Sequence, residues 1–162
     1  MTTPKLLQRT PELVLTYAAG SHTSPSSRWG LRTLVMRGDG ALELDSRWYT
    51  KRRTFQGRVS PAVVERVLAL LEAGNFPTTP AHRIPPGSSL RTVHVKNGAL
   101  EGYTLPIDWH VGAEMAEYKD AFKLLDSIAR QVTVDEIQAT PDFEPGLVEG
   151  ATKLTDVIEP PT

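Results

Sequence analysis

The chain has 162 residues, of which 40% are hydrophobic and 23% charged, and its 18 Lys/Arg and 19 Asp/Glu give a formal net charge of −1. These values are typical of one globular domain with a substantial core. The chain contains no cysteine, which excludes a disulfide framework, a thiolate nucleophile and Cys-ligated zinc or iron–sulfur centres.

The N-terminal residues 1–11 are polar and contain two prolines, so we expect a loose lead-in before the folded domain. They lack the apolar segment that a signal peptide needs. No stretch of the sequence reaches the roughly 18–20 apolar residues of a membrane span. We therefore expect a cytoplasmic protein with no membrane contact.

Successive strands are predicted up to residue 57. Glu12–Ala18 has the pattern of a first strand. Leu31–Arg37 and Ala41–Asp45 are β-prone segments joined by Gly-Asp-Gly, and these turn residues tolerate the positive φ of a tight hairpin. Trp48–Gly57 is expected to form a further strand.

A first helix is predicted at Pro61–Ala73. Ser60 can cap its free N–H groups, and proline suits the first helical position because the missing N–H costs little there. Gly74 is expected to end the helix in a left-handed conformation. The apolar stripe of this helix comprises Val63, Val64, Val67, Leu68, Leu70 and Leu71.

A second hairpin and a second helix follow an irregular, proline-rich connection. Leu90–Lys96 and Ala99–Leu105 flank Asn-Gly, a strong hairpin signal. The second helix is expected from about Ala113 to Gln131, with an Asp126–Arg130 ion pair on its solvent side. Its buried face comprises Met115, Tyr118, Ala121, Phe122, Leu125, Ile128 and Val132.

The segment 47–58 combines five basic residues and three aromatic residues with no acidic residue. It is compatible with a nucleic-acid patch in which cations neutralise phosphates and aromatic rings stack on bases. The preferred interpretation is a solvent-facing strand whose basic residues also guard a sheet edge. A more specific alternative is a docking site for the acidic tail of this chain or for an acidic partner. The candidate binding residues here are Arg47, Trp48, Tyr49, Lys51, Arg52, Arg53 and Arg58.

Asp108 and His110 are the weak catalytic candidates, because they flank Trp109 after a strand and could act as a general acid–base pair. No nucleophile elbow, glycine-rich phosphate loop or metal-type histidine spacing accompanies them. We therefore expect no cofactor and no metal, and an enzyme is a secondary hypothesis.

The C-terminal residues 132–162 carry seven acidic residues and one lysine, whereas residues 1–131 carry 17 basic and 12 acidic residues. Prolines and the absence of periodicity predict an extended or disordered acidic tail. Apolar residues recur along it, and we select Phe143, Leu154 and Ile158 as candidate docking residues.

These patterns predict an α+β domain at residues 12–131. It has one mainly antiparallel sheet of five to six strands with two amphipathic helices on one face, a layout shared by many small bacterial domains. The leading functional hypothesis is a non-catalytic protein-binding or adaptor domain, compatible with an inhibitory or immunity-type role. Its partner is another protein, and the sequence indicates no oligomeric state. The alternatives are a small hydrolase-like enzyme using Asp108 and His110, and a nucleic-acid binder through Arg47–Arg58, which the weak basic excess does not favour.

Overall fold

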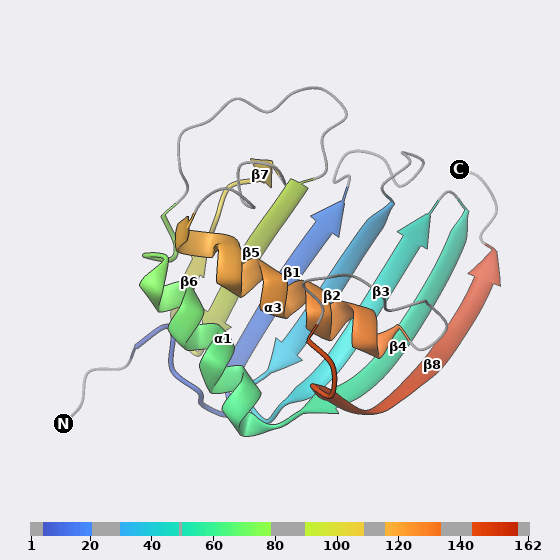
Figure 1. Cartoon of the computed structure of the whole chain (residues 1–162), viewed down its shortest axis with the longest axis horizontal. Coiled ribbons are helices and arrows are strands. Elements are labelled where there is room, and N and C mark those ends of the chain that lie inside the picture. The colour runs from blue at the N-terminus through green and yellow to red at the C-terminus, as the bar shows by residue number, and fades with distance from the viewer. Residues whose placement is uncertain are drawn as a thin grey trace.

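The computed structural model describes residues 5–20, 30–48, 50–78, 90–108, 116–133 and 144–158. The fold is α+β, as predicted, with one antiparallel sheet and two helices among these residues. Figure 1 shows both helices on the same face of the sheet, with α3 crossing the strands and α1 beside it. The strands are β1 (Leu13–Gly20), β2 (Leu31–Arg37), β3 (Ala41–Trp48), β4 (Lys51–Val59), β5 (Leu90–Asn97), β6 (Leu100–Tyr103), β7 (Ile107–Asp108) and β8 (Val148–Ile158), and the helices are α1 (Pro61–Ala73) and α3 (Ala116–Val132).

The strand order across the sheet is β6-β5-β1-β2-β3-β4-β8, and the short β7 pairs with β5. The expected count of five to six strands is therefore too low, since the described part of the chain already contributes eight strands to the sheet. The count fell short because β7 has only two residues and because β8 comes from the acidic tail. β8 pairs with β4, so the sheet extends beyond the boundary at residue 131 that the sequence suggested for the body.

The core lies between the sheet and the two helices. Alternate residues of each strand point toward the helices, so that Leu15, Leu34 and Val95 are fully buried there. From α3, Tyr118, Phe122 and the other described residues of its predicted apolar face are buried against them. The predicted apolar stripes of both helices thus pack against the sheet, as expected for amphipathic helices.

Helix α1 begins and ends as its sequence predicts, with one difference at the C-terminus. The hydroxyl of Ser60 accepts a hydrogen bond from the backbone N–H of Val63 at 3.4 Å, and Pro61 occupies the first turn. Gly74 has φ −85°, so the prediction of a left-handed Gly74 is wrong. The next residue, Asn75, adopts φ 59° instead, and asparagine is among the few residues that tolerate this conformation.

Both predicted hairpins are present. β2 pairs with β3 and β5 pairs with β6, each around the predicted turn. The predicted strand Trp48–Gly57 is wrong only at its start, because β3 continues to Trp48 and β4 begins at Lys51. Trp48 and Lys51 are paired across this turn, so the basic-aromatic segment folds back on itself.

The segment 5–10 is held against the end of β5 by Asn97. The amide nitrogen Nδ2 of this buried side chain donates to the backbone carbonyls of Lys5, Leu6 and Gln8 at 3.3, 3.1 and 2.9 Å. Its oxygen Oδ1 accepts a hydrogen bond from the Thr10 hydroxyl at 2.5 Å. The Asn-Gly turn therefore also fixes a segment that is far away in the sequence.

Neither helix of the described residues combines the length and the apolar character that crossing a bilayer requires.

Candidate functional site: a corner of the sheet

The sheet corner is the surface formed by Trp48, Lys51, Arg53 and Ile158. Trp48 ends β3, Lys51 begins β4 and Ile158 ends β8, and the three lie side by side in register across the neighbouring strands. Residues directly opposite in antiparallel strands point to the same face. The three side chains therefore form one row at the edge of the sheet that Figure 1 shows on the right.

This corner exposes large apolar side chains. Trp48 is 52% exposed and Ile158 is 80% exposed. Leu154 and Val157 of β8 are also exposed, at 53% and 46%, but Val157 is opposite Arg52 and therefore lies on the other face. Single exposed apolar residues are ordinary on protein surfaces, but neighbouring ones mark interaction sites. The second row, Arg53 opposite Asp156, lies on the same face, and the Arg53 guanidinium lies 5.6 Å from the centre of the buried Phe55 ring. A cation thus borders the apolar row on its inner side.

The remaining cations of the segment 47–58 do not lie on the same face. Arg47 and Arg52 are opposite each other on the face that faces away from the helices. Both contact Asp45, with Arg52 Nη2 at 3.0 Å from Oδ2 and Arg47 Nε at 3.6 Å from Oδ1. Arg58 lies further along β4, where it donates to the backbone carbonyl of Asp39 at 2.9 Å and is opposite Glu149. The basic cluster is therefore divided between two faces and interleaved with acidic residues.

The tail reaches the corner because polar side chains of α3 hold its backbone. Gln131 Oε1 accepts hydrogen bonds from the N–H groups of Leu147 at 2.7 Å and Val148 at 3.2 Å, and its Nε2 donates to the carbonyl of Glu144. Ser127 Oγ accepts from the Glu144 N–H at 3.2 Å. These bonds place residues 144–148 at the start of β8, which then follows β4 to the corner.

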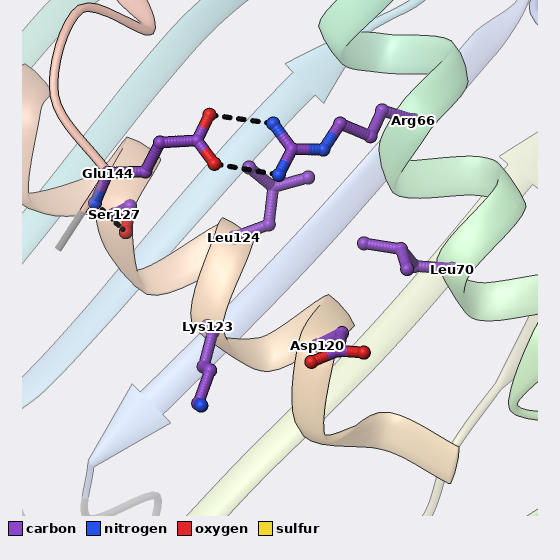
Figure 2. Close-up of a pocket in the computed structure, with 7 residues that line it drawn as sticks. All are labelled: Arg66, Leu70, Asp120, Lys123, Leu124, Ser127 and Glu144. Atoms are coloured by element: carbon purple, nitrogen blue, oxygen red, sulfur yellow. Dashed lines mark hydrogen bonds and ion pairs between the residues drawn. The ribbon is translucent and has the colours of Figure 1, made fainter. Parts of the chain in front are cut away.

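A hollow of about 370 Å³ lies between α1 and α3. Figure 2 shows Arg66 from α1 meeting the Glu144 carboxylate over it, with two parallel hydrogen bonds of 2.6 and 2.7 Å. This guanidinium lowers the pKa of Glu144, and the carboxylate raises the pKa of Arg66. The Arg66 guanidinium is already paired with the Glu144 carboxylate, and Ser127 binds the Glu144 backbone. We therefore interpret the hollow as part of the contact that attaches the C-terminal segment to the helices. The lining residues are Arg66, Leu70, Asp120, Lys123, Leu124, Ser127 and Glu144.

A second polar group lies beneath α3. The hydroxyl of the buried Tyr17 donates to Asp126 Oδ1 at 2.8 Å, and Arg91 Nη2 lies 3.9 Å from Asp126 Oδ2. Burial raises the pKa of Asp126 against the opposing effect of Arg91, and burial beside Asp126 raises the pKa of Tyr17. The prediction that Asp126 lies on the solvent side of the helix is therefore wrong, because it faces the sheet and binds Tyr17.

Several predicted site residues remain untested. Tyr49, His110 and Phe143 lie outside the described residues, and Asp108 ends β7 without a described side chain. In the described ranges, no group of three or more His, Asp or Glu side chains could hold a metal ion.

Sequence reasoning selected Trp48, Lys51, Arg53 and Ile158, and the structure brings these together at one corner. Leu154, also selected, lies at the register shift of β8. It missed Arg66 and Gln131. Arg66 and Gln131 carried no signal, because each acts on a segment far along the chain.

No family model matches this chain, and no curated protein is significantly similar to it in sequence.

Proposed function

We propose that this chain is a non-catalytic protein-binding domain and that the sheet corner docks its partner. The observation that carries the proposal is the row of Trp48, Lys51 and Ile158, adjacent in register and with both apolar side chains at least half exposed. Tryptophan and arginine are enriched among the residues that dominate binding energy at protein interfaces. The corner offers a tryptophan, an aliphatic neighbour and a cationic border in one place.

The partner that fits this surface is a protein with an apolar contact and an acidic residue at its border. Apolar side chains would cover Trp48 and Ile158, and a carboxylate would approach Lys51. Burying an exposed aromatic residue of this size supplies hydrophobic free energy, while the charges mainly set orientation and association rate.

The distribution of the basic residues favours a protein over a nucleic acid as the partner. A nucleic-acid site needs cations gathered on one face along the path of the phosphates. Here Arg47 and Arg52 share Asp45 on one face, while Arg53 lies opposite Asp156 on the other. This mixture of charges weakens phosphate binding but suits an interface with both signs of charge.

The acidic tail contributes to this function by building the surface. β8 supplies Ile158 to the corner, and β3 and β4 supply the tryptophan and the cations. In this proposal, the body and the tail act as one docking surface, as an adaptor or inhibitory domain requires.

The test is capture of a partner from the native host by the full chain, followed by binding measurements with purified partner. We expect Trp48→Ala to weaken binding by at least about tenfold, as the loss of a central interface tryptophan does. The matched control is Tyr103→Ala, because Tyr103 is also an exposed aromatic residue, 62% accessible, but lies on β6 at the opposite edge.

Equal binding by the wild type and Trp48→Ala would contradict the proposal. Fluorescence anisotropy with a labelled single-stranded oligonucleotide at low salt tests the alternative that the chain binds nucleic acid. Tight binding there that is lost at higher salt would favour the nucleic-acid hypothesis instead.

A further inference from the structure

β8 forms one edge of the sheet, and its outer side is a long, exposed strand edge. The strand has 11 residues, whereas β6 at the opposite edge has four. Within the described ranges, no strand pairs with the outer side of β8, as Figure 1 shows. A long edge strand presents backbone N–H and C=O groups that a further strand can bind.

Natural proteins often guard such edges with a lysine or a bulge. β8 has both, with Lys153 near its middle and register shifts opposite Thr54/Phe55 and Gln56/Arg58. The lysine is nevertheless neutralised within the strand, because its Nζ lies 3.2 Å from Asp156 Oδ2. The apolar side chains of Leu154, Val157 and Ile158 remain exposed beside this pair. The charge that would repel a second strand is therefore balanced.

The first register shift gives the edge a self-complementary charge pattern. Lys153 is opposite Phe55 and Asp156 is opposite Arg53, so the extra residue, Leu154, brings the two charges onto the same face although they are three positions apart. A second copy of β8 can lie antiparallel to the first about a two-fold axis between Leu154 and Thr155. Lys153 of each copy then lies opposite Asp156 of the other, twice in one interface.

We propose that the chain forms a two-fold symmetric dimer in which the two β8 strands pair antiparallel and join the sheets of both copies. Self-complementary surfaces of this kind generate closed dimers. The inference is independent of the proposed function, because it rests on the backbone edge and on two charges that lie outside the row of Trp48, Lys51 and Ile158. Its consequence is that one particle carries two sheet corners, which raises avidity for a partner with two matching sites.

The test is sedimentation velocity of the full chain over a range of concentrations. We expect the wild type to form a dimer whose population grows with concentration. Lys153→Asp and Asp156→Lys should each raise the dimer dissociation constant by at least about tenfold, because two attractive cross-strand pairs become repulsive. The matched control is Lys119→Asp, which makes the same charge change on an exposed position of α3 and should leave the dimer unchanged.

An equimolar mixture of Lys153→Asp and Asp156→Lys chains makes the test independent of folding defects. Each variant keeps its own internal repulsion, because one carries an acidic residue at both positions and the other a lysine at both. A heterodimer places the two acidic residues of one chain opposite the two lysines of the other. We therefore expect the mixture to recover dimers of one chain of each kind.

The inference would be overturned by a wild type that stays monomeric up to its solubility limit, by single variants that dimerise as well as the wild type, or by a mixture that recovers no heterodimer. Open-ended larger oligomers would also overturn it, since a two-fold pairing closes after two copies. Trp48→Ala should retain the dimer, so a failure of the proposed function and a failure of this inference give different results.

Discussion

The side chain of Gln131 binds the backbone of Leu147, with Gln131 Oε1 accepting the Leu147 N–H at 2.7 Å. The same oxygen accepts the N–H of Val148, and the amide nitrogen donates to the carbonyl of Glu144. One residue at the end of α3 therefore satisfies three backbone groups at the start of β8. Because unpaired buried backbone groups are costly, this contact fixes where the tail joins the sheet.

Replacement of this residue should loosen β8 without unfolding the rest. We expect Gln131→Ala to destabilise the attachment of residues 144–158 by about 1–3 kcal/mol, the usual cost of leaving such groups unsatisfied. Hydrogen exchange of the β8 amides should then accelerate at least about tenfold, while β1 and β5 keep their protection. Lys119→Ala, on an exposed position of the same helix, is the control. Unchanged exchange in β8 would show that β4 alone holds the strand.

The partly buried carboxyl of Asp126 should make stability depend on pH. Its pKa is raised above the ordinary value of 3.8, chiefly by burial, so the folded chain binds this proton more tightly than the unfolded chain. The stability that the proton contributes is present below the ordinary carboxyl pKa and is lost as the pH rises through the raised value.

The Asp126→Asn variant lacks this titration but keeps an oxygen that can accept from Tyr17. The stability of the wild type relative to this variant should therefore fall as the pH rises from about 4 toward neutrality. Urea unfolding of both proteins at several pH values measures the difference. A difference that grows with pH would mean that the contact with Arg91 outweighs burial.

The contacts of Asn97 should make it important for stability. Asn97→Ala removes the donor that serves the carbonyls of Lys5, Leu6 and Gln8, and we expect a loss of about 1–3 kcal/mol in the free energy of unfolding. The neighbouring Lys96 is exposed, and Lys96→Ala should change stability by less than about 0.5 kcal/mol. Chemical denaturation of both variants tests this. Equal effects would show that residues 5–10 do not depend on the amide.

Two turn glycines should respond differently to substitution. Gly40 and Gly98 both have positive φ, at 93° and 62°. A Cβ on Gly40 would lie 2.0 Å from the carbonyl oxygen of Val59, whereas a Cβ on Gly98 would have no neighbour within 4 Å.

Gly98→Ala should therefore cost only the conformational penalty of about 1–2 kcal/mol, and Gly40→Ala should cost distinctly more because backbone must also move. Thermal unfolding of the two variants compares these costs. A Gly40→Ala protein as stable as Gly98→Ala would show that the backbone around Gly40 and Val59 can shift at little energetic cost.

Local features were predictable because their causes lie within a few residues. Ser60 and Pro61 begin α1 through backbone geometry and a single capping bond, and the Gly-Asp-Gly and Asn-Gly turns join strands that follow each other directly. The apolar stripes of both helices indicated which faces pack on a sheet.

Contacts between distant segments were not predictable in this way. Asp126 has the spacing of a surface residue, and only its position above Tyr17 makes it a partly buried group. The expected five to six strands omitted β8, because the composition of the tail favours an extended or disordered chain. What keeps it in the sheet is the edge of β4 together with Gln131, Ser127 and Arg66.

The sequence by itself determined the α+β class, both hairpins, helix α1 and the residue types of the candidate site. Only the tertiary structure decided that Trp48 and Ile158 flank Lys51 at one corner and that Arg47 and Arg52 lie on the opposite face. The physical reason is that side chains alternate along a strand, and the register between strands depends on backbone pairing over the whole sheet. Residues that are clustered in the sequence therefore form one surface only if the strand pairing places their side chains on the same face.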